Sequence, residues 1–387
     1  MTATLTRLHN RDRILRVIRQ FFWSRDFLEV ETPILLAQPS QEPHLEPMRT
    51  TVRDYRGEAH NGFLRMSPEF SIKKLLPLLV SLRGARATKQ SRPPANGIAT
   101  ARSADLAMTS NEEPRGVFEI GPVFRDGEPW GGAHNPEFTM LEWYRLGATY
   151  RDLMRDCEAL IGEFVRNVGA ALRGRPRSGQ GLAYQGQTIN CAPSWERLTM
   201  RRAWQRYARL DLDQLLSRAA LARVCSARGY SVQSGDTFDD LFFKIHLTEV
   251  EPKLGRSKPT FLIDWPTQMA ALARKKPRNS RYAERVELYI GGLEIANGFS
   301  ELTDADEQLA RFRSDQRLRK RLGRPAYPID RDFIAALRKM PPTAGVALGV
   351  DRLVMLLLDA ATIDEVRWLP APALFEHRKI KTLNSKS

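Results

Sequence analysis

Cysteine and long apolar runs are scarce in this sequence of 387 residues. The three cysteines, Cys157, Cys191 and Cys225, are odd in number and widely spaced, which fits neither a disulfide framework nor the ligand spacing of a zinc site. No apolar run is long enough for a transmembrane helix. The apolar residues near 14–22 are interleaved with arginines, unlike a signal peptide. We therefore expect a protein of the reducing cytoplasm without a membrane segment.

Acidic residues are too few to balance the basic ones, and the formal net charge is +15. Residues 83–104 contain five basic side chains, residues 377–387 contain four, and neither segment contains an acid. Such charge runs are usually solvated segments, although a basic surface can also bind an acidic macromolecule. Composition alone leaves both readings open.

Residue periodicity predicts an α+β fold in which an antiparallel sheet is flanked by helices. Helical spacing of apolar residues predicts helices over 8–27, 67–76, 150–168, 198–228, 238–249, 304–322, 331–340 and 351–358. Strands are expected at 28–32, 62–66, 117–125, 138–144, 260–264, 286–290, 293–301 and 345–350. Pro77 should kink or end the second helix. Residues 83–115 are rich in Ala, Ser, Arg and Pro and lack a period, which indicates a flexible insertion.

A first group of polar residues surrounds the loop between the strands at 117–125 and 138–144. Arg125 ends one strand, and Glu128, His134 and Asn135 lie in the glycine-containing loop. The planar fork of an arginine suits a phosphate group, and Phe138 could stack on a flat base. An ordinary hairpin with an exposed arginine is an equally simple reading of this segment alone.

A second group lies in the hairpin at 286–302. A two-residue turn at Gly291 and Gly292 would pair Tyr289 with Glu294 and place Glu287 diagonally from Glu294. Two such carboxylates suit Mg²⁺ and, with it, a polyphosphate, although they could also be solvated.

The same hairpin continues with Asn297, Phe299 and Glu301, which strict alternation would turn away from Glu294. A single site that uses both sets needs a β-bulge, for which Gly298 is the expected place.

A third group is the strand-to-helix junction at 345–356. Gly349 allows close approach of the backbone to a ligand, and the helix start with Arg352 favours an anion. Asp351 as a simple helix cap is the alternative.

Taken in order, FLEVETP (27–33), FRDGE with HNPEF (124–138) and GVALGVDR (345–352) resemble the three signature motifs of class II aminoacyl-tRNA synthetases. SPE (67–69), HNPEFTMLEWY (134–144) and NGFSELTDA (297–305) resemble the lysyl-tRNA synthetase branch. The resemblance implies a class II catalytic domain over residues 1–370, interrupted by the insertion at 83–115 and followed by a basic, disordered tail at 371–387.

Lysyl-tRNA synthetases carry an anticodon-binding barrel before this domain, whereas the catalytic pattern here begins almost at Met1. The chain is therefore similar to the barrel-less paralogues that modify elongation factor P, the elongation factor P–(R)-β-lysine ligases. The resemblance implies a ligase that activates (R)-β-lysine or lysine with ATP and Mg²⁺, and transfers it to the ε-amino group of a lysine on elongation factor P. A homodimer through the first motif is implied. The alternatives are an enzyme that charges tRNA and a non-catalytic regulatory paralogue.

The family also implies roles for individual residues. Arg125 and Arg352 would be catalytic, and Glu287 and Glu294 would hold the metal ion. ATP would contact Arg125, Glu128, Asn135, Phe138, Glu294, Ile295, Gly349 and Arg352. The amino acid would contact Ser67, Pro68, Glu69, Glu142, Tyr144, Asn297, Phe299 and Glu301. These carboxylates explain why Glu142 stands at an apolar-face position of its strand: a diammonium substrate needs them.

Two departures from the lysyl-tRNA synthetase pattern are expected to matter. Glu128 follows Arg125 by three residues instead of two, and Trp130 in the same loop could cover the site. Ala347 stands where those enzymes commonly have glycine, and its methyl group could select between amino-acid isomers.

Overall fold

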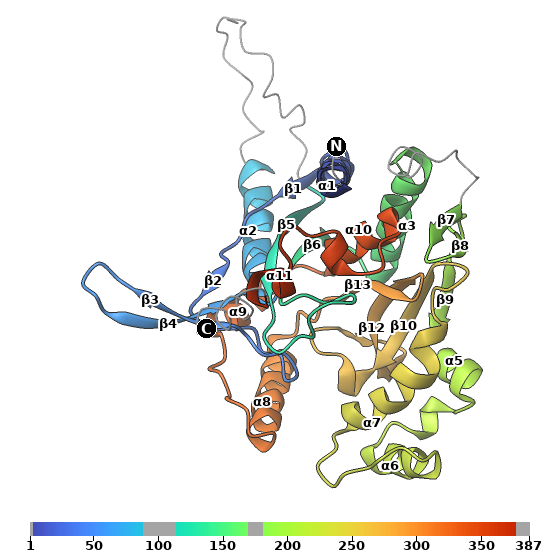
Figure 1. Ribbon diagram of the computed structural model, residues 1–387. Helices are drawn as coiled ribbons and strands as arrows, with labels where there is room; N and C mark the ends of the chain where they lie inside the picture. The colour runs from blue at the N-terminus through green and yellow to red at the C-terminus, as the bar shows by residue number, and fades with distance from the viewer. Residues whose placement is uncertain (1–2, 88–113, 169–180, 377–387) are drawn as a thin grey trace, which may run out of the picture.

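The structure is a computed structural model that describes residues 3–87, 114–168 and 181–376 (Figure 1). Within these residues nine strands form one sheet in the order β1-β5-β6-β14-β13-β12-β10-β9, with β11 beside β12. The pairs β1–β5 and β10–β9 are parallel, and the other pairs are antiparallel. The strands of this sheet are β1 (Phe27–Glu29), β5 (Gly116–Phe124), β6 (Glu137–Leu146), β9 (Glu196–Thr199), β10 (Thr260–Pro266), β11 (Lys275–Lys276), β12 (Asn279–Ile290), β13 (Leu293–Ser300) and β14 (Thr343–Gly349).

Two small sheets accompany the main one. The first joins β2 (Leu35–Leu36), β4 (Ala59–Leu64) and β3 (Arg49–Arg53), and its β3–β4 hairpin projects from the body of the molecule (Figure 1). The second pairs β7 (Gly181–Tyr184) with β8 (Gln187–Asn190). The predicted α+β class with a mainly antiparallel sheet is therefore confirmed.

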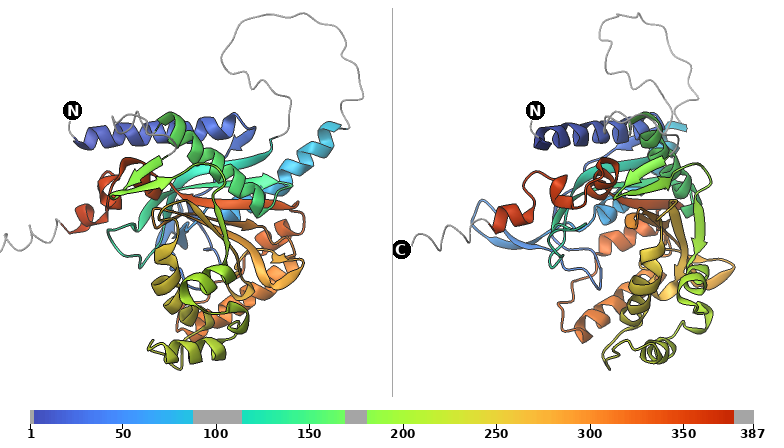
Figure 2. Two further views of the ribbon diagram at one scale, coloured as in Figure 1. Left: turned by 90° about the vertical axis from the view of Figure 1, so that its right-hand side faces the viewer. Right: turned by 45° about the vertical axis from the view of Figure 1, so that its right-hand side comes forward.

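Helices cover both faces of the main sheet. On one face lie α1 (Ala3–Trp23), α3 (Tyr150–Glu163) and α10 (Val350–Leu358), whose apolar residues share a core with the sheet (Figures 1 and 2). The other face meets α2 (Glu69–Ala87), α8 (Ala305–Arg321) and α9 (Arg331–Leu337). Strand β6 shows the alternation directly, because Trp143 belongs to the first core and Tyr144 to the second.

The helix boundaries depart from the sequence expectation at two places. Helix α1 buries Ile14, Ile18 and Phe22 as predicted, but it ends at Trp23, four residues early. Helix α2 continues past Pro77 to Ala87, so an end of the helix at this proline is wrong. A proline inside a helix costs about 3 kcal/mol, and the packing of the buried Leu76 and Phe70 in the core shared with α9 offsets it.

The predicted insertion and tail are only partly within the described residues. Residues 83–87 still belong to α2, and residues 88–113 lie outside the described ranges. The predicted tail begins with the short helix α11 (Ala371–Phe375), and residues 377–387 lie outside the described ranges.

A separate helical lobe packs beside β9 and β10. It contains α5 (Met200–Ala203), α6 (Arg218–Ala227) and α7 (Phe238–Ile245), with π-helical turns at Trp204–Ala208 and His246–Val250. The single helix expected at 198–228 is therefore wrong, because these residues form several short helices in place of one.

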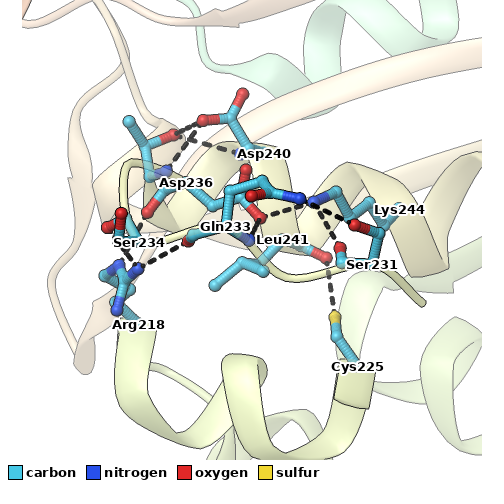
Figure 3. Close-up of polar contacts among 10 residues, drawn as sticks. Arg218, Cys225, Ser231, Gln233, Ser234, Asp236, Asp240, Leu241 and Lys244 are labelled. Carbon is cyan, nitrogen blue, oxygen red and sulfur yellow. Dashed lines mark hydrogen bonds and ion pairs between the residues drawn. The ribbon is translucent and has the colours of Figure 1, made fainter. Parts of the chain in front are cut away.

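The connection from α6 to α7 in this lobe is held by charged side chains (Figure 3). Arg218 donates to the carbonyl oxygens of Gln233, Ser234 and Asp236, and Lys244 donates to the Asp236 carboxylate at 2.5 Å. The connection is thereby fixed although it has no regular structure.

None of the helices formed by the described residues combines the length and apolar character needed to cross a membrane.

Candidate active site

A cavity of about 790 Å³ opens on the face of the sheet that meets α2. Its walls come from β6, β12, β13 and β14, the β5–β6 loop, the start of α2, the loop after β2 and the end of α7. Of the residues implied by the family resemblance, those lining it are Ser67, Glu69, Arg125, Glu128, Asn135, Phe138, Glu142, Tyr144, Glu287, Glu294, Ile295, Asn297, Phe299, Gly349 and Arg352. Pro68 and Glu301 are not among the lining residues.

Glu142 forms the floor of one end of this cavity. It is 2% exposed and accepts hydrogen bonds from the Ser67 hydroxyl at 2.6 Å and the Tyr144 hydroxyl at 2.8 Å. Burial, and then the nearby Glu69 carboxylate, raise the pKa of Glu142 to about 7. An incoming ammonium group would restore the charged form, so this end of the cavity favours a cation.

Lys73 is a site residue that the sequence interpretation missed. Its ammonium group is buried between Glu69, at 2.5 Å, and Glu301. Glu301 is therefore paired inside the protein and does not face the cavity. Lys73 follows Glu69 by one helical turn on a helix with an apolar face, and this spacing was the available signal.

Arginines dominate the other end of the cavity. The Arg125 guanidinium lies 5.1 Å from the centre of the Phe138 ring, and its buried Nε has no hydrogen-bond partner among the described residues. Glu128 is only loosely associated with it, at 4.0 Å. A buried donor without an acceptor is costly, so an anionic ligand at this place fits.

Arg352 ties the β5–β6 loop to β13 at the same end. It donates to the carbonyl oxygens of Glu294 at 3.0 Å and Ala133 at 3.2 Å, and it contacts His134 Nε2 at 3.0 Å. Burial, and then Arg352, lower the pKa of His134. His134 is therefore neutral at pH 7 and can accept a hydrogen bond from Arg352.

The hairpin of β12 and β13 has the predicted turn and register, with Tyr289 opposite Glu294. The predicted bulge also exists, but its place at Gly298 is wrong. The register shifts between Leu288, which faces Ala296, and Tyr289, so that Ile295 is the extra residue. Beyond the bulge Glu287 lies directly opposite Asn297, and Glu287, Glu294, Asn297 and Phe299 all line the cavity, whereas Glu301 does not.

Three carboxylates gather beside this bulge. Glu287 accepts from Arg285 at 2.7 Å and from the Tyr289 hydroxyl at 2.7 Å, and burial raises its pKa, as does the nearby Glu294. Burial, and then Glu294, raise the pKa of Glu251 to about 7. Oxygen donors that repel one another fit a divalent cation such as Mg²⁺.

One group of acidic and histidine side chains already close enough to share an ion lies elsewhere among the described residues. It consists of Asp54, Glu58 and His60 at the turn of the β3–β4 hairpin, and it is largely exposed. Exposed groups of this kind commonly hold no ion.

Other residues singled out in the sequence have structural contacts. Asn135 donates to the carbonyl oxygen of Glu137 at 2.6 Å and accepts from the Ala371 amide at 2.9 Å. Trp130 packs against Phe375, with ring centres 5.4 Å apart, and it is not among the lining residues.

Comparison with known proteins gives a consistent match. Residues 2–77 and 108–373 match the sequence model of the family described as class II tRNA synthetases (D, K and N). The chain is 35% identical to the elongation factor P–(R)-β-lysine ligase of Vibrio cholerae, over 96% of this chain and 97% of that protein. A ligase of the same name from Yersinia enterocolitica is also 35% identical, over 95% and 96%. The lysine–tRNA ligase of Magnetococcus marinus is 35% identical as well, over 93% of this chain and 62% of that protein.

Proposed function

Since the chain belongs to the class II tRNA synthetase family (D, K and N), we propose that it is an ATP-dependent ligase that attaches (R)-β-lysine to elongation factor P. The observation that carries this proposal is the end-to-end match to ligases of that name, together with a cavity that has arginines at one end and carboxylates at the other. The match to a lysine–tRNA ligase favours a second candidate, a tRNA-charging enzyme.

In the first half-reaction, a carboxylate oxygen of the amino acid attacks the α-phosphorus of ATP, and pyrophosphate leaves. Arg125 holds the α-phosphate and the amino-acid carboxylate together, and Arg352 holds the γ-phosphate. Phe138 stacks on the adenine, with Glu128 and Asn135 beside the nucleotide. No protein nucleophile is required, because positioning and charge neutralisation lower the barrier.

Mg²⁺ between Glu287 and Glu294 would neutralise charge on the leaving pyrophosphate. The Nε of Arg125, which lacks an acceptor, supports an anion at its place. The pKa values of Glu251 and Glu287, which burial and the nearby Glu294 raise, support a cation beside Glu294.

The amino-acid side chain would enter the carboxylate end, where Glu142 and Glu69 hold its amine. Ala347 faces Glu142 on one neighbouring strand and Asn297 on the other. Its methyl group therefore stands in the floor between two proposed substrate contacts, which supports a role in choosing between α-lysine and β-lysine.

In the second half-reaction, the ε-amine of a lysine on the acceptor attacks the acyl carbon of the adenylate. An amide forms and AMP leaves. We expect this reaction in the cytoplasm.

A homodimer through residues 27–33 belongs to the same proposal. Large apolar side chains are exposed around this segment, including Trp23 at 54%, Leu28 at 39% and Leu35 at 45%. An exposed apolar patch of this kind favours a protein interface. Sedimentation of the protein as a monomer would contradict the dimer.

ATP–pyrophosphate exchange with lysine and with (R)-β-lysine, followed by transfer to purified elongation factor P or to tRNA, tests the function. We expect exchange with (R)-β-lysine and transfer to elongation factor P. Transfer to tRNA alone would overturn the proposal in favour of the second candidate.

A further inference from the structure

Glu42 is a carboxylate of the cavity that neither the motifs nor the first half-reaction uses. It lies in the loop between β2 and β3, is half-buried, and lines the cavity beside Ser40 and Leu45. Its carboxylate forms no hydrogen bond or ion pair within the described residues.

The backbone around Glu42 is firmly held. The buried Arg319 donates to the carbonyl oxygens of Glu42 at 2.9 Å and Leu45 at 3.0 Å, and it pairs with the Glu46 carboxylate at 2.8 Å. Gln41 adds a hydrogen bond of 2.9 Å to the carbonyl oxygen of Pro328. An unpaired carboxylate on a fixed backbone is suited to a reaction that needs a placed base.

The charged groups that act on Glu42 locate it within the site. Burial, and then Glu69 on α2, raise the pKa of Glu42 to about 7, with a smaller contribution from Asp315 on α8, while Arg125 and Arg285 act in the opposite direction. Glu42 thus lies within electrostatic reach of Glu69 at the amino-acid end and of Arg125 at the phosphate end. Under the proposed function, the bond between acyl group and phosphate lies between these two ends.

Other carboxylates of the cavity are already engaged. Glu142 accepts from Ser67 and Tyr144, and Glu69 is paired with Lys73. Glu287 accepts from Arg285. The second half-reaction meanwhile needs a base, since a lysine ε-amine has a pKa of about 10.4 and enters as an ammonium ion.

We propose that Glu42 is the base that deprotonates the acceptor lysine in the second half-reaction, an inference that rests on the proposed function. One proton of the ε-ammonium passes to the Glu42 carboxylate, and the freed nitrogen lone pair forms a bond to the acyl carbon. The bond from that carbon to the phosphate oxygen breaks, and AMP takes the electron pair. The second proton leaves the nitrogen for the AMP phosphate, so that a neutral amide remains.

The test measures the two half-reactions separately in the wild type and in the variants Glu42→Gln and Glu42→Asp. The control is Glu58→Gln, which changes an exposed glutamate at the turn of the β3–β4 hairpin. Each protein is loaded with ATP and (R)-β-lysine, and the isolated adenylate complex is mixed with elongation factor P, with Nα-acetyl-lysine amide, or with hydroxylamine. Hydroxylamine is largely unprotonated at neutral pH and needs no base. ATP–pyrophosphate exchange is measured in parallel.

We expect Glu42→Gln to slow transfer to both lysine acceptors by about 100-fold, the low end of the range for general-base catalysis. Exchange and reaction with hydroxylamine should stay at the wild-type level, Glu42→Asp should recover part of the transfer, and Glu58→Gln should match wild type. The rate of transfer by the wild type should rise as the pH increases through about 7, and this pH-dependent increase should be absent in Glu42→Gln.

Equal loss with lysine acceptors and hydroxylamine, or a loss confined to exchange, would overturn the inference. Transfer by the wild type to tRNA and not to elongation factor P would overturn the proposed function instead. In that case the role of Glu42 is still decided by comparing the rates at which Glu42→Gln and the wild type transfer the acyl group to Nα-acetyl-lysine amide. If the wild type does not transfer to Nα-acetyl-lysine amide, the proposed role of Glu42 is refuted.

Discussion

Replacement of Lys73 by methionine should cost the protein about 3–5 kcal/mol of unfolding free energy. The side chain of Lys73 is 1% exposed, and its ammonium group is the cation between Glu69 and the fully buried Glu301. Burial raises the pKa of Glu301, and the neighbouring Lys73 lowers it. Without the ammonium group, Glu301 must either remain as a buried charge or take up a proton, and both cost free energy.

The double variant Lys73→Met with Glu301→Gln provides the matched control. It removes both charges, and replacement of a whole buried ion pair is often nearly neutral. Urea unfolding of the wild type, both single variants and the double variant gives the coupling free energy between the two residues. If the Lys73→Met variant alone unfolds at the wild-type urea concentration, the assignment of Lys73 as the counterion of Glu301 is wrong.

Four further predictions concern the site and the helical lobe. His246 is fully buried, and burial lowers its pKa to about 3. Only the unfolded state therefore takes up a proton at His246 as the pH falls below ~6.5, so the free energy of unfolding should fall by about 2 kcal/mol between pH 7 and pH 5. A His246→Phe variant whose urea midpoint shows the same fall would contradict this. Glu142 must be ionised to hold an amine and has a pKa of about 7, so the KM for the amino acid should decrease as the pH rises through 7, and a flat profile would argue against its role. Ala347→Gly should shift the preference between α-lysine and (R)-β-lysine in ATP–pyrophosphate exchange toward α-lysine by about 10-fold, which lies within the ~1–3 kcal/mol that one methyl group contributes. An unchanged preference would exclude Ala347 from amino-acid selection. Arg125→Ala should reduce kcat/KM in the same exchange assay by about 10²–10³-fold, and an effect on KM for the amino acid alone would contradict phosphate contact.

Local patterns were sufficient for most of the fold. The Gly291–Gly292 turn fixed the pairing of Tyr289 with Glu294, since a two-residue hairpin loop allows only one register. The apolar stripe of Ile14, Ile18 and Phe22 likewise identified the buried face of α1. Such features depend on residues close in sequence, which is why periodicity predicts them.

The errors have tertiary causes. Helix α2 passes through Pro77 because its apolar side chains are packed in a core with α9, a contact between distant segments. Glycine content favoured a bulge at Gly298, but Gly298 pairs in regular register with Val286 of β12 and with Val346 of β14, and the bulge falls at Ile295 instead. Glu42 belongs to no motif, and its place in the cavity depends on contacts between distant segments, such as the hydrogen bond from Arg319 to its carbonyl oxygen.

The charge of Lys73 also enters the selection of a diamino acid that we propose for this pocket. Glu69, Glu142 and Glu301 together with the Lys73 ammonium leave two net negative charges when all are ionised. Under the proposed function, a lysine-type substrate would bring two ammonium groups to this end, while its carboxylate would be directed to Arg125. Without substrate the surplus charge is unfavourable. Burial, and then the neighbouring carboxylates, raise the pKa values of Glu142 and Glu301. A substrate with one amine would leave one buried carboxylate uncompensated, so the charge balance itself disfavours monoamino acids before shape is considered.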